Sequence, residues 1–157
     1  MKYISTLVVV QDMAKSRRFY EEVFGLKVVV DFGANITFDA GFSLQSRDSW
    51  SDFIEKPVAE IQSGGNCFEL YFEQDDLDAF LQQNQNRRLE MVHGVKEFPW
   101  GQRVIRLYDP DRHIVEVGES MKAVVLRLLA QGMSPEETAK KTMHPLEFVQ
   151  ACANGAI

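Results

Sequence analysis

The sequence predicts an α+β protein made of two similar βαβββ modules and a C-terminal helical appendage. Three observations support this class. Short runs rich in β-branched residues alternate with one helical segment in the order β-α-β-β-β, and the same order restarts near residue 66. From Met121 onward the apolar residues recur at helical spacing. The length of 157 residues suits one domain with an appendage.

The first module covers about residues 1–46. Residues 3–10 (YISTLVVV) predict a strand, and Asp12 is well placed to cap a helix whose apolar residues share one face. Gly25 is typical of a residue that ends a helix in the left-handed conformation. LKVVVDF predicts the next strand, and ITFDAGFSLQS predicts two short strands separated at Ala40-Gly41.

The second module covers about residues 66–118 and follows a polar segment, 47–65, that we expect to be irregular. CFELYFE predicts a strand, Asp75-Asp76 a helix cap, and LDAFLQQNQNR a helix. EMVHGVKEF, GQRVIRLY and HIVEVGES predict three further strands. When Val10 is aligned with Gln74, Asp12 falls on Asp76, which indicates one module used twice.

The appendage, residues 121–157, predicts three short helices. Ser134-Pro135-Glu136-Glu137 has the pattern of a capping box with proline in the first turn. Two capped helices in succession suggest a helix-turn-helix, but LEFVQAC has no Lys or Arg to contact DNA, and residues 119–157 carry four basic and four acidic side chains. We therefore expect this segment to pack against the body or a second subunit. A regulatory tail that contacts a partner when ligand binds is the alternative.

The bulk composition excludes several classes of function. A net charge of −6 argues against a nucleic-acid binder, which needs a basic face. The apolar run near the N-terminus, LVVV, is too short for a signal peptide or a membrane span, so we expect a cytoplasmic protein without a membrane partner. Cys67 and Cys152 have no metal-type spacing, and we expect two reduced, buried thiols.

Three segments resemble the vicinal oxygen chelate superfamily, which includes glyoxalases, bleomycin-resistance proteins and extradiol dioxygenases. They are LVVVQDMAKSRRFYEEVFGLKV, ELYFEQDDLDAF and WGQRVIRLYDPDRHIVEV. The resemblance implies a domain over residues 1–120 in which paired βαβββ modules form a curled sheet around a ligand cleft. It implies a homodimer that binds a small organic ligand. Because one fold hosts unrelated chemistries, whether the chain is an enzyme stays open, and no catalytic residue is assigned.

The resemblance also assigns the positions at which metal-dependent relatives hold an ion. These fall on Ser5, Gln45 (or Ser43), Glu69 and Glu116. A serine hydroxyl is a poor ligand, and no histidine stands at any of the positions. We therefore predict no cofactor and interpret the two glutamates as cleft carboxylates. The alternative is a lyase, isomerase or dioxygenase that holds magnesium or manganese through Glu69, Glu116 and Gln45.

The closing hairpin predicts how the cleft carboxylate Glu116 is balanced. If residues 109–112 form the corner, with Asp109 and Asp111 as turn formers, Ile105 faces Glu116. Arg103 then shares a face with Glu116, either as part of a ligand site or as an internal ion pair.

Loop aromatics complete the predicted site, because aromatic surfaces dominate small-molecule pockets. A structural role in packing is the alternative for these rings. The predicted ligand-binding residues are Trp50, Phe98, Trp100, Arg103, Glu69 and Glu116.

Overall fold

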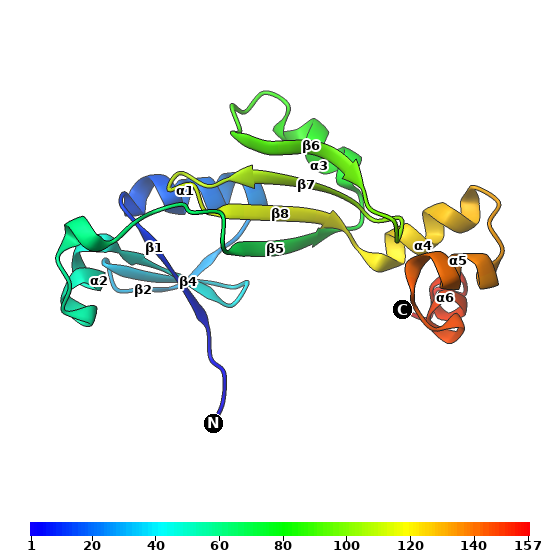
Figure 1. Cartoon of the computed structure of the whole chain (residues 1–157), viewed down its shortest axis with the longest axis horizontal. Coiled ribbons are helices and arrows are strands. Elements are labelled where there is room, and N and C mark those ends of the chain that lie inside the picture. Colours follow the sequence, from blue (N-terminus) through cyan, green and yellow to red (C-terminus); the bar gives the residue numbers. More distant parts are fainter. The chain divides into compact units, whose positions relative to one another are not determined.

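The computed structural model describes residues 1–157 and contains two four-stranded mixed sheets and three C-terminal helices (Figure 1). Contacts divide the chain into two compact units. The first comprises residues 1–68 and 108–114, and the second comprises residues 69–107 and 115–157. Neither sheet is strongly curled, so the α+β class and the paired modules are confirmed while the strong curl is not seen.

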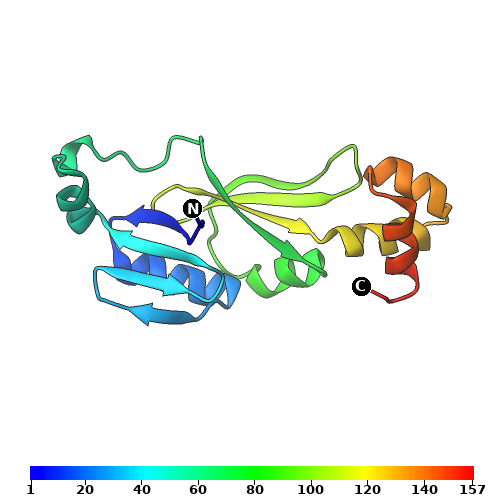
Figure 2. The same cartoon turned by 90° about the horizontal axis from the view of Figure 1, so that it is seen from below.

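The first unit contains one βαβββ module. Its elements are β1 (Thr6–Val10), α1 (Met13–Phe24), β2 (Val28–Asp31), β3 (Asn35–Phe38) and β4 (Phe42–Ser46). The sheet order is β1-β4-β3-β2. β1 runs parallel to β4 with Leu7 opposite Ser43, and the other pairs are antiparallel. Figure 2 shows α1 lying along this sheet.

Helix α1 begins and ends at the predicted residues. The Asp12 side chain accepts a hydrogen bond from the Lys15 amide, and Gly25 adopts φ +68°, a conformation that costs glycine little. The helix buries Tyr20, whose ring contacts Phe38 and Phe42 at centroid distances of 5.7 and 5.2 Å. This aromatic group fills the core between α1 and the sheet, as the apolar stripe predicted.

We expected the segment after β4 to be irregular, but it begins with a helix. α2 (Arg47–Ile54) follows β4 directly, and a 3₁₀ turn, η1 (Val58–Glu60), comes later. Ser46 caps α2 by accepting from the Ser49 amide at 3.4 Å. This helix was not predicted although Trp50, Phe53 and Ile54 recur at helical spacing, and it buries none of its residues.

The second unit repeats the module. Its elements are β5 (Glu69–Gln74), α3 (Leu77–Asn84), β6 (Met91–Glu97), β7 (Arg103–Tyr108) and β8 (Ile114–Glu119), in the sheet order β5-β8-β7-β6. This order repeats that of the first sheet strand for strand. Asp76 caps α3 through the Ala79 amide, as Asp12 caps α1, so the predicted internal repeat is confirmed.

The hairpin between β7 and β8 differs by one residue from the prediction. The strands end at Tyr108 and resume at Ile114, so five residues connect them and not four. Arg112 takes the extra, left-handed position at φ +65°, and the Asp109 amide donates to the His113 carbonyl. Because side chains alternate along a strand, a shift of one residue changes which side chains share a face.

The appendage forms a small three-helix cluster in the second unit. α4 (Met121–Ala130), α5 (Pro135–Thr142) and α6 (Leu146–Ala153) pack on one another, as Figures 1 and 2 show. Val125, Val149 and Cys152 are buried at the centre of this cluster. The capping box of Ser134 and Glu137 is present, as predicted.

The two cysteines are free and differ in environment. Cys152 is buried, and burial raises the pKa of its thiol, whereas Cys67 is exposed. The expectation that both are buried is therefore wrong for Cys67, which lies in the residues that precede β5. None of the helices has the length and apolar character needed to cross a membrane.

Candidate functional site

A row of polar side chains crosses the second sheet, with one residue on each strand. Glu69 lies on β5, Glu116 on β8, Arg106 on β7 and His93 on β6, which is the order of the strands in the sheet. His93 is paired with Arg106 in the β6–β7 register. We call these four residues the polar row.

Arg106 connects the other members of the polar row. Its Nε donates to Glu69 Oε2 at 2.9 Å, and its Nη2 forms an ion pair with Glu116 Oε2. The Glu116 side chain is only 9% exposed, whereas that of Glu69 is 40% exposed. A carboxylate this buried requires a charged partner, and the Arg106 guanidinium supplies it.

Both ring nitrogens of His93 have a hydrogen-bonding partner. Its Nδ1 lies 2.7 Å from the Gly94 carbonyl oxygen, which can only accept, and its Nε2 lies 3.3 Å from Arg106 Nη1, which can only donate. The tautomer that carries its proton on Nδ1 and leaves Nε2 as an acceptor fits both contacts. In the polar row, two carboxyl groups therefore share one guanidinium.

The structure places Arg103 apart from Glu116, and the predicted Arg103–Glu116 pair is wrong. Arg103 instead donates through Nε to Glu119 Oε1 at 2.9 Å and through Nη2 to Asp78 Oδ2 at 3.0 Å. The Glu119 hydrogen bond, with lesser help from Asp78, raises the pKa of the guanidinium above its usual value. The five-residue connection of the hairpin explains the error, because it puts Arg106 on the face of Glu116.

Two of the predicted aromatic residues adjoin the polar row. The rings of Phe98 and Trp100 stack at a centroid distance of 4.7 Å and an angle of 8°. The Arg106 guanidinium lies 5.7 Å and the Lys96 amine 5.2 Å from the Phe98 ring centroid. Both distances are within the range of cation–π attraction. The polar row thus has an aromatic platform beside it.

A hydrogen-bonded chain fixes the Trp100 ring. Trp100 Nε1 donates to Gln102 Oε1 at 3.0 Å, and Gln102 Nε2 donates to the Tyr71 hydroxyl at 2.9 Å. The Tyr71 hydroxyl donates in turn to Glu73. Burial, followed by the Glu73 hydrogen bond, raises the pKa of Tyr71 to about 12, so it stays a donor at neutral pH. Gly118 leaves room for this chain, because a Cβ there would lie 2.9 Å from Gln102 Nε2.

Trp50 belongs to the first unit and lines a separate cavity of about 250 Å³. The other walls of this cavity come from β1, from the segment that follows η1 and from the β7–β8 connection; they are Leu7, Val8, Val9, Ile61, Gln62, Gly64, Phe68 and His113. This mixture of apolar walls with a few polar groups is typical of a small-molecule site. The predicted residues Phe98, Trp100, Glu69 and Glu116 thus lie together in the second unit, whereas Trp50 lies in the first.

The four positions inherited from metal-dependent relatives do not fit a metal ion. The Ser5 hydroxyl donates to backbone carbonyls, including that of Gly41 at 3.0 Å. The Gln45 side-chain oxygen accepts from Asn35 Nδ2 at 2.8 Å, and its amide nitrogen donates to Ser49. Glu69 and Glu116 are both paired with Arg106. Within either unit, no group of three or more His, Cys, Asp or Glu side chains is arranged as a metal site.

The sequence reasoning missed Arg106 and His93, the two residues that complete the polar row. Alternation along β7 would have found Arg106 had the β7–β8 connection been given five residues. His93 carried no local signal, since it reaches the row only through the bulged pairing of β6 with β7.

The comparison with protein families assigns the fold to a known class. A glyoxalase-like domain model matches residues 3–122, and the chain therefore belongs to the glyoxalase-like domain family of the vicinal oxygen chelate superfamily. This confirms the resemblance inferred from the sequence motifs. The match ends within α4, so most of the appendage lies outside the family domain. No curated protein matches the chain.

Solved structures agree with this assignment. A protein of unknown function from Agrobacterium tumefaciens str. C58 is 35% identical, with a TM-score of 0.69 over 76% of this chain and 94% of its own. A lactoylglutathione lyase from Agrobacterium tumefaciens is 24% identical, with a TM-score of 0.60 over 76% and 93%. A glyoxalase/bleomycin resistance protein/dioxygenase from Nocardioides is 17% identical, with a TM-score of 0.63 over 76% and 83%. The last two are similar in fold alone.

Proposed function

We propose that this glyoxalase-like protein binds a small aromatic or amphipathic organic ligand at the polar row, without a metal ion between Glu69 and Glu116. One observation carries the proposal. The Arg106 guanidinium pairs with both carboxylates, so a cation from the chain itself already balances the groups that would bind a metal ion. A divalent ion would have to displace a partly buried guanidinium that also contacts His93.

The remaining contacts define what the ligand needs. The Phe98–Trp100 stack offers a flat apolar surface, which favours an aromatic body on the ligand. The half-exposed Glu69 carboxylate retains lone pairs beyond its bond to Arg106, which favours a hydroxyl or amine on the ligand. The role is binding and orientation; no residue of the row stands beside a nucleophile, and no covalent step is proposed.

Metal content tests the metal-free part of the proposal. Protein purified without chelators should contain far less than one metal ion per chain, and titration with Mn²⁺ should show no site in the micromolar range. The Arg106→Gln variant should gain Mn²⁺ affinity because it frees both carboxylates, while Arg103→Gln, which alters the neighbouring Glu119 pair, should not. Stoichiometric metal in the wild type that disappears in Glu116→Gln would contradict the proposal.

Ligand binding is tested by thermal shift against a panel of aromatic amines, phenols and their apolar parent rings. We expect hits among the amines and phenols that are weakened by Glu69→Gln and retained by the control Glu147→Gln, a change at an exposed residue of α6. If the binding of the hits depends on neither Glu69 nor Phe98, the ligand binds elsewhere, which would contradict the assignment to the polar row.

A further inference from the structure

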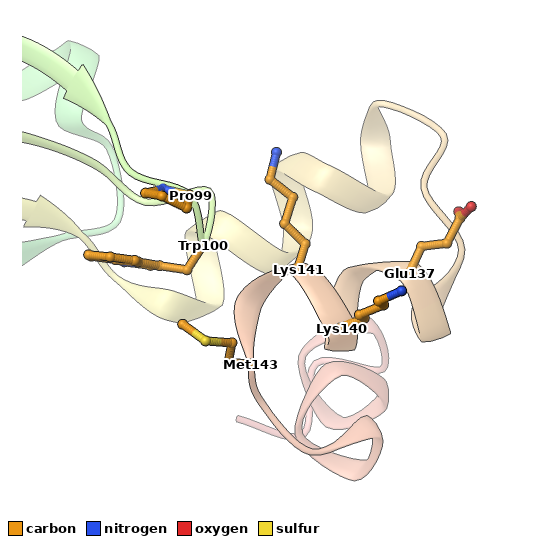
Figure 3. A pocket seen from close by; sticks show the side chains of 6 residues that line it. All are labelled: Pro99, Trp100, Glu137, Lys140, Lys141 and Met143. Carbon is orange, nitrogen blue, oxygen red and sulfur yellow. The ribbon is translucent and has the colours of Figure 1, made fainter.

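We propose a second binding site, for a small aromatic anion, where the β6–β7 turn meets the appendage. It goes beyond the proposed function: it shares Trp100 with the aromatic stack beside the polar row, but the four residues of the polar row contribute none of its walls. A pocket of about 420 Å³ is lined by Pro99, Trp100, Glu137, Lys140, Lys141 and Met143. Figure 3 shows that the first two side chains come from the turn and the other four from α5 and the residue that ends it.

The turn that carries Trp100 is fixed against the appendage. Gly101 adopts φ +88°, and a Cβ there would lie 3.2 Å from Leu128 Cδ1 and 3.3 Å from Lys141 Cε. The Arg127 guanidinium donates to the Gly101 carbonyl at 2.5 Å. One face of the Trp100 ring is stacked on Phe98, and its Nε1 is bonded to Gln102. The aromatic wall is therefore rigid before any ligand arrives, which lowers the entropic cost of binding.

The charges at the pocket favour an anion. Lys140 is exposed and forms no ion pair, whereas Lys141 lies 3.4 Å from Glu97. The single acid in the lining, Glu137, is committed to the capping box, where its Oε2 accepts from the Ser134 amide at 2.8 Å. A ligand carboxylate or sulfonate near Lys140 would thus meet an ammonium group that has no partner in the chain.

Met143 supplies an independent indication that the pocket binds an apolar group. It ends α5 at φ +58°, a left-handed conformation in which glycine or asparagine is favoured, and it is 75% exposed. Its left-handed backbone conformation costs free energy in a residue other than glycine. Its side chain extends toward the Trp100 ring (Figure 3), where it would cover the second face of a bound ring.

The experiment uses the full chain labelled with ¹⁵N and titrated with 2-naphthoate. The chain has only two tryptophans, so one indole N–H signal reports on the Trp100 ring, which this pocket shares with the aromatic stack, and the other on the cavity of the first unit (Trp50). The variants of Lys140 and Met143 described below distinguish this pocket from the polar row. We expect a saturable shift of the Trp100 signal and none of the Trp50 signal. Neutral 2-naphthamide, which has the same rings, should bind at least roughly threefold more weakly because it lacks the charge that Lys140 recognises.

Two variants separate the site from general folding effects. Lys140→Gln should weaken naphthoate binding by roughly threefold to fivefold, the range of one exposed ion pair, while the exposed control Lys15→Gln leaves it unchanged. Met143→Gly should raise the melting temperature, because glycine tolerates the left-handed position, yet weaken binding.

The proposal is overturned if Lys140→Gln and Met143→Gly bind like the wild type, if naphthamide binds as well as naphthoate, or if Trp50 responds in place of Trp100. Because Lys140 and Met143 lie outside the polar row, these outcomes leave the proposed function untouched, and failure of the metal test leaves this site untouched.

Discussion

The imidazole of His113 is bonded to a fully buried carboxylate, that of Asp109. His113 Nδ1 lies 2.9 Å from Asp109 Oδ2, which also accepts from the Tyr20 hydroxyl at 2.9 Å. Asp109 Oδ1 accepts from the backbone amides of Asp111 and His113. The carboxylate thus ties the connection between β7 and β8 to α1. Asp109 was expected only to form a turn, and it does so while also anchoring the first unit.

This arrangement predicts a pH-dependent contribution of His113 to stability. Burial lowers the pKa of His113. The hydrogen bond and charge of Asp109, together with the charge of Asp111, raise the pKa by more than burial lowers it, so the net shift is upward. A raised pKa in the folded state means that the contribution is fully present below the unfolded value of about 6.5 and is lost as pH rises through the folded value.

The measurement is urea unfolding of the wild type and His113→Asn at pH 5.5 and pH 8.5. The difference in free energy of unfolding between the two proteins should be larger at pH 5.5. An equal difference at both pH values would show that His113 contributes only as a neutral donor.

At the scale of elements, one buried glutamate joins the end of β8 to α4. Glu119 is 2% exposed and accepts hydrogen bonds from the Arg103 amide and Nε and from the Arg127 Nε and Nη2, at 2.8 to 3.1 Å. Burial raises the pKa of Glu119, but the hydrogen bonds from Arg127 and Arg103 outweigh it, and the net pKa is lowered. The contribution of Glu119 is therefore present above the unfolded value and lost as acid protonates it.

We expect Glu119→Gln to lower the free energy of unfolding by about 1–3 kcal/mol at pH 7, because two guanidinium groups lose their shared partner. A double-mutant cycle with Arg127→Met should show coupling, and amide exchange in α4 should become faster. Glu21→Gln, which breaks an exposed pair with Arg17, is the control and should cost less than about 0.5 kcal/mol. Equal effects of the two glutamine substitutions would contradict the role given to Glu119.

The sequence predicted the elements better than the contacts between them. Helices α1, α3 and α5 begin at the predicted caps because a cap is a local property of a few residues. The pairing of β7 with β8 depends on a single left-handed residue, Arg112. The sequence does not predict this conformation, because left-handed positions usually favour glycine. That residue decides whether Arg103 or Arg106 shares a face with Glu116, and so the fold was predictable while the polar row was not.

At the scale of the whole molecule, exposed apolar side chains support our proposal that the chain forms a homodimer. β2 is an edge strand, and Val29, Val30 and Phe32 at or beside it are 59%, 39% and 78% exposed. The pairing of β2 with β3 is bulged between Val28 and Val30, and a bulged edge resists the addition of another strand. We therefore propose contact through the apolar side chains of this edge and not through a continued sheet.

Light scattering coupled to gel filtration should give twice the chain mass of 17.9 kDa at about 100 µM, a concentration at which a micromolar dimer is saturated. Replacing Val29 and Phe32 by lysine should shift the mass toward that of one chain, because both side chains are exposed in the single chain and become desolvated only on association. The circular dichroism spectrum of this double variant should stay that of the wild type. Lysines in place of Leu126 and Ile157, two exposed apolar residues of the appendage, serve as the control and should leave the mass unchanged. A monomeric wild type at this concentration would contradict the proposal of a dimer. A dimer whose mass is unaffected by the β2 lysines would show that the interface lies on another surface.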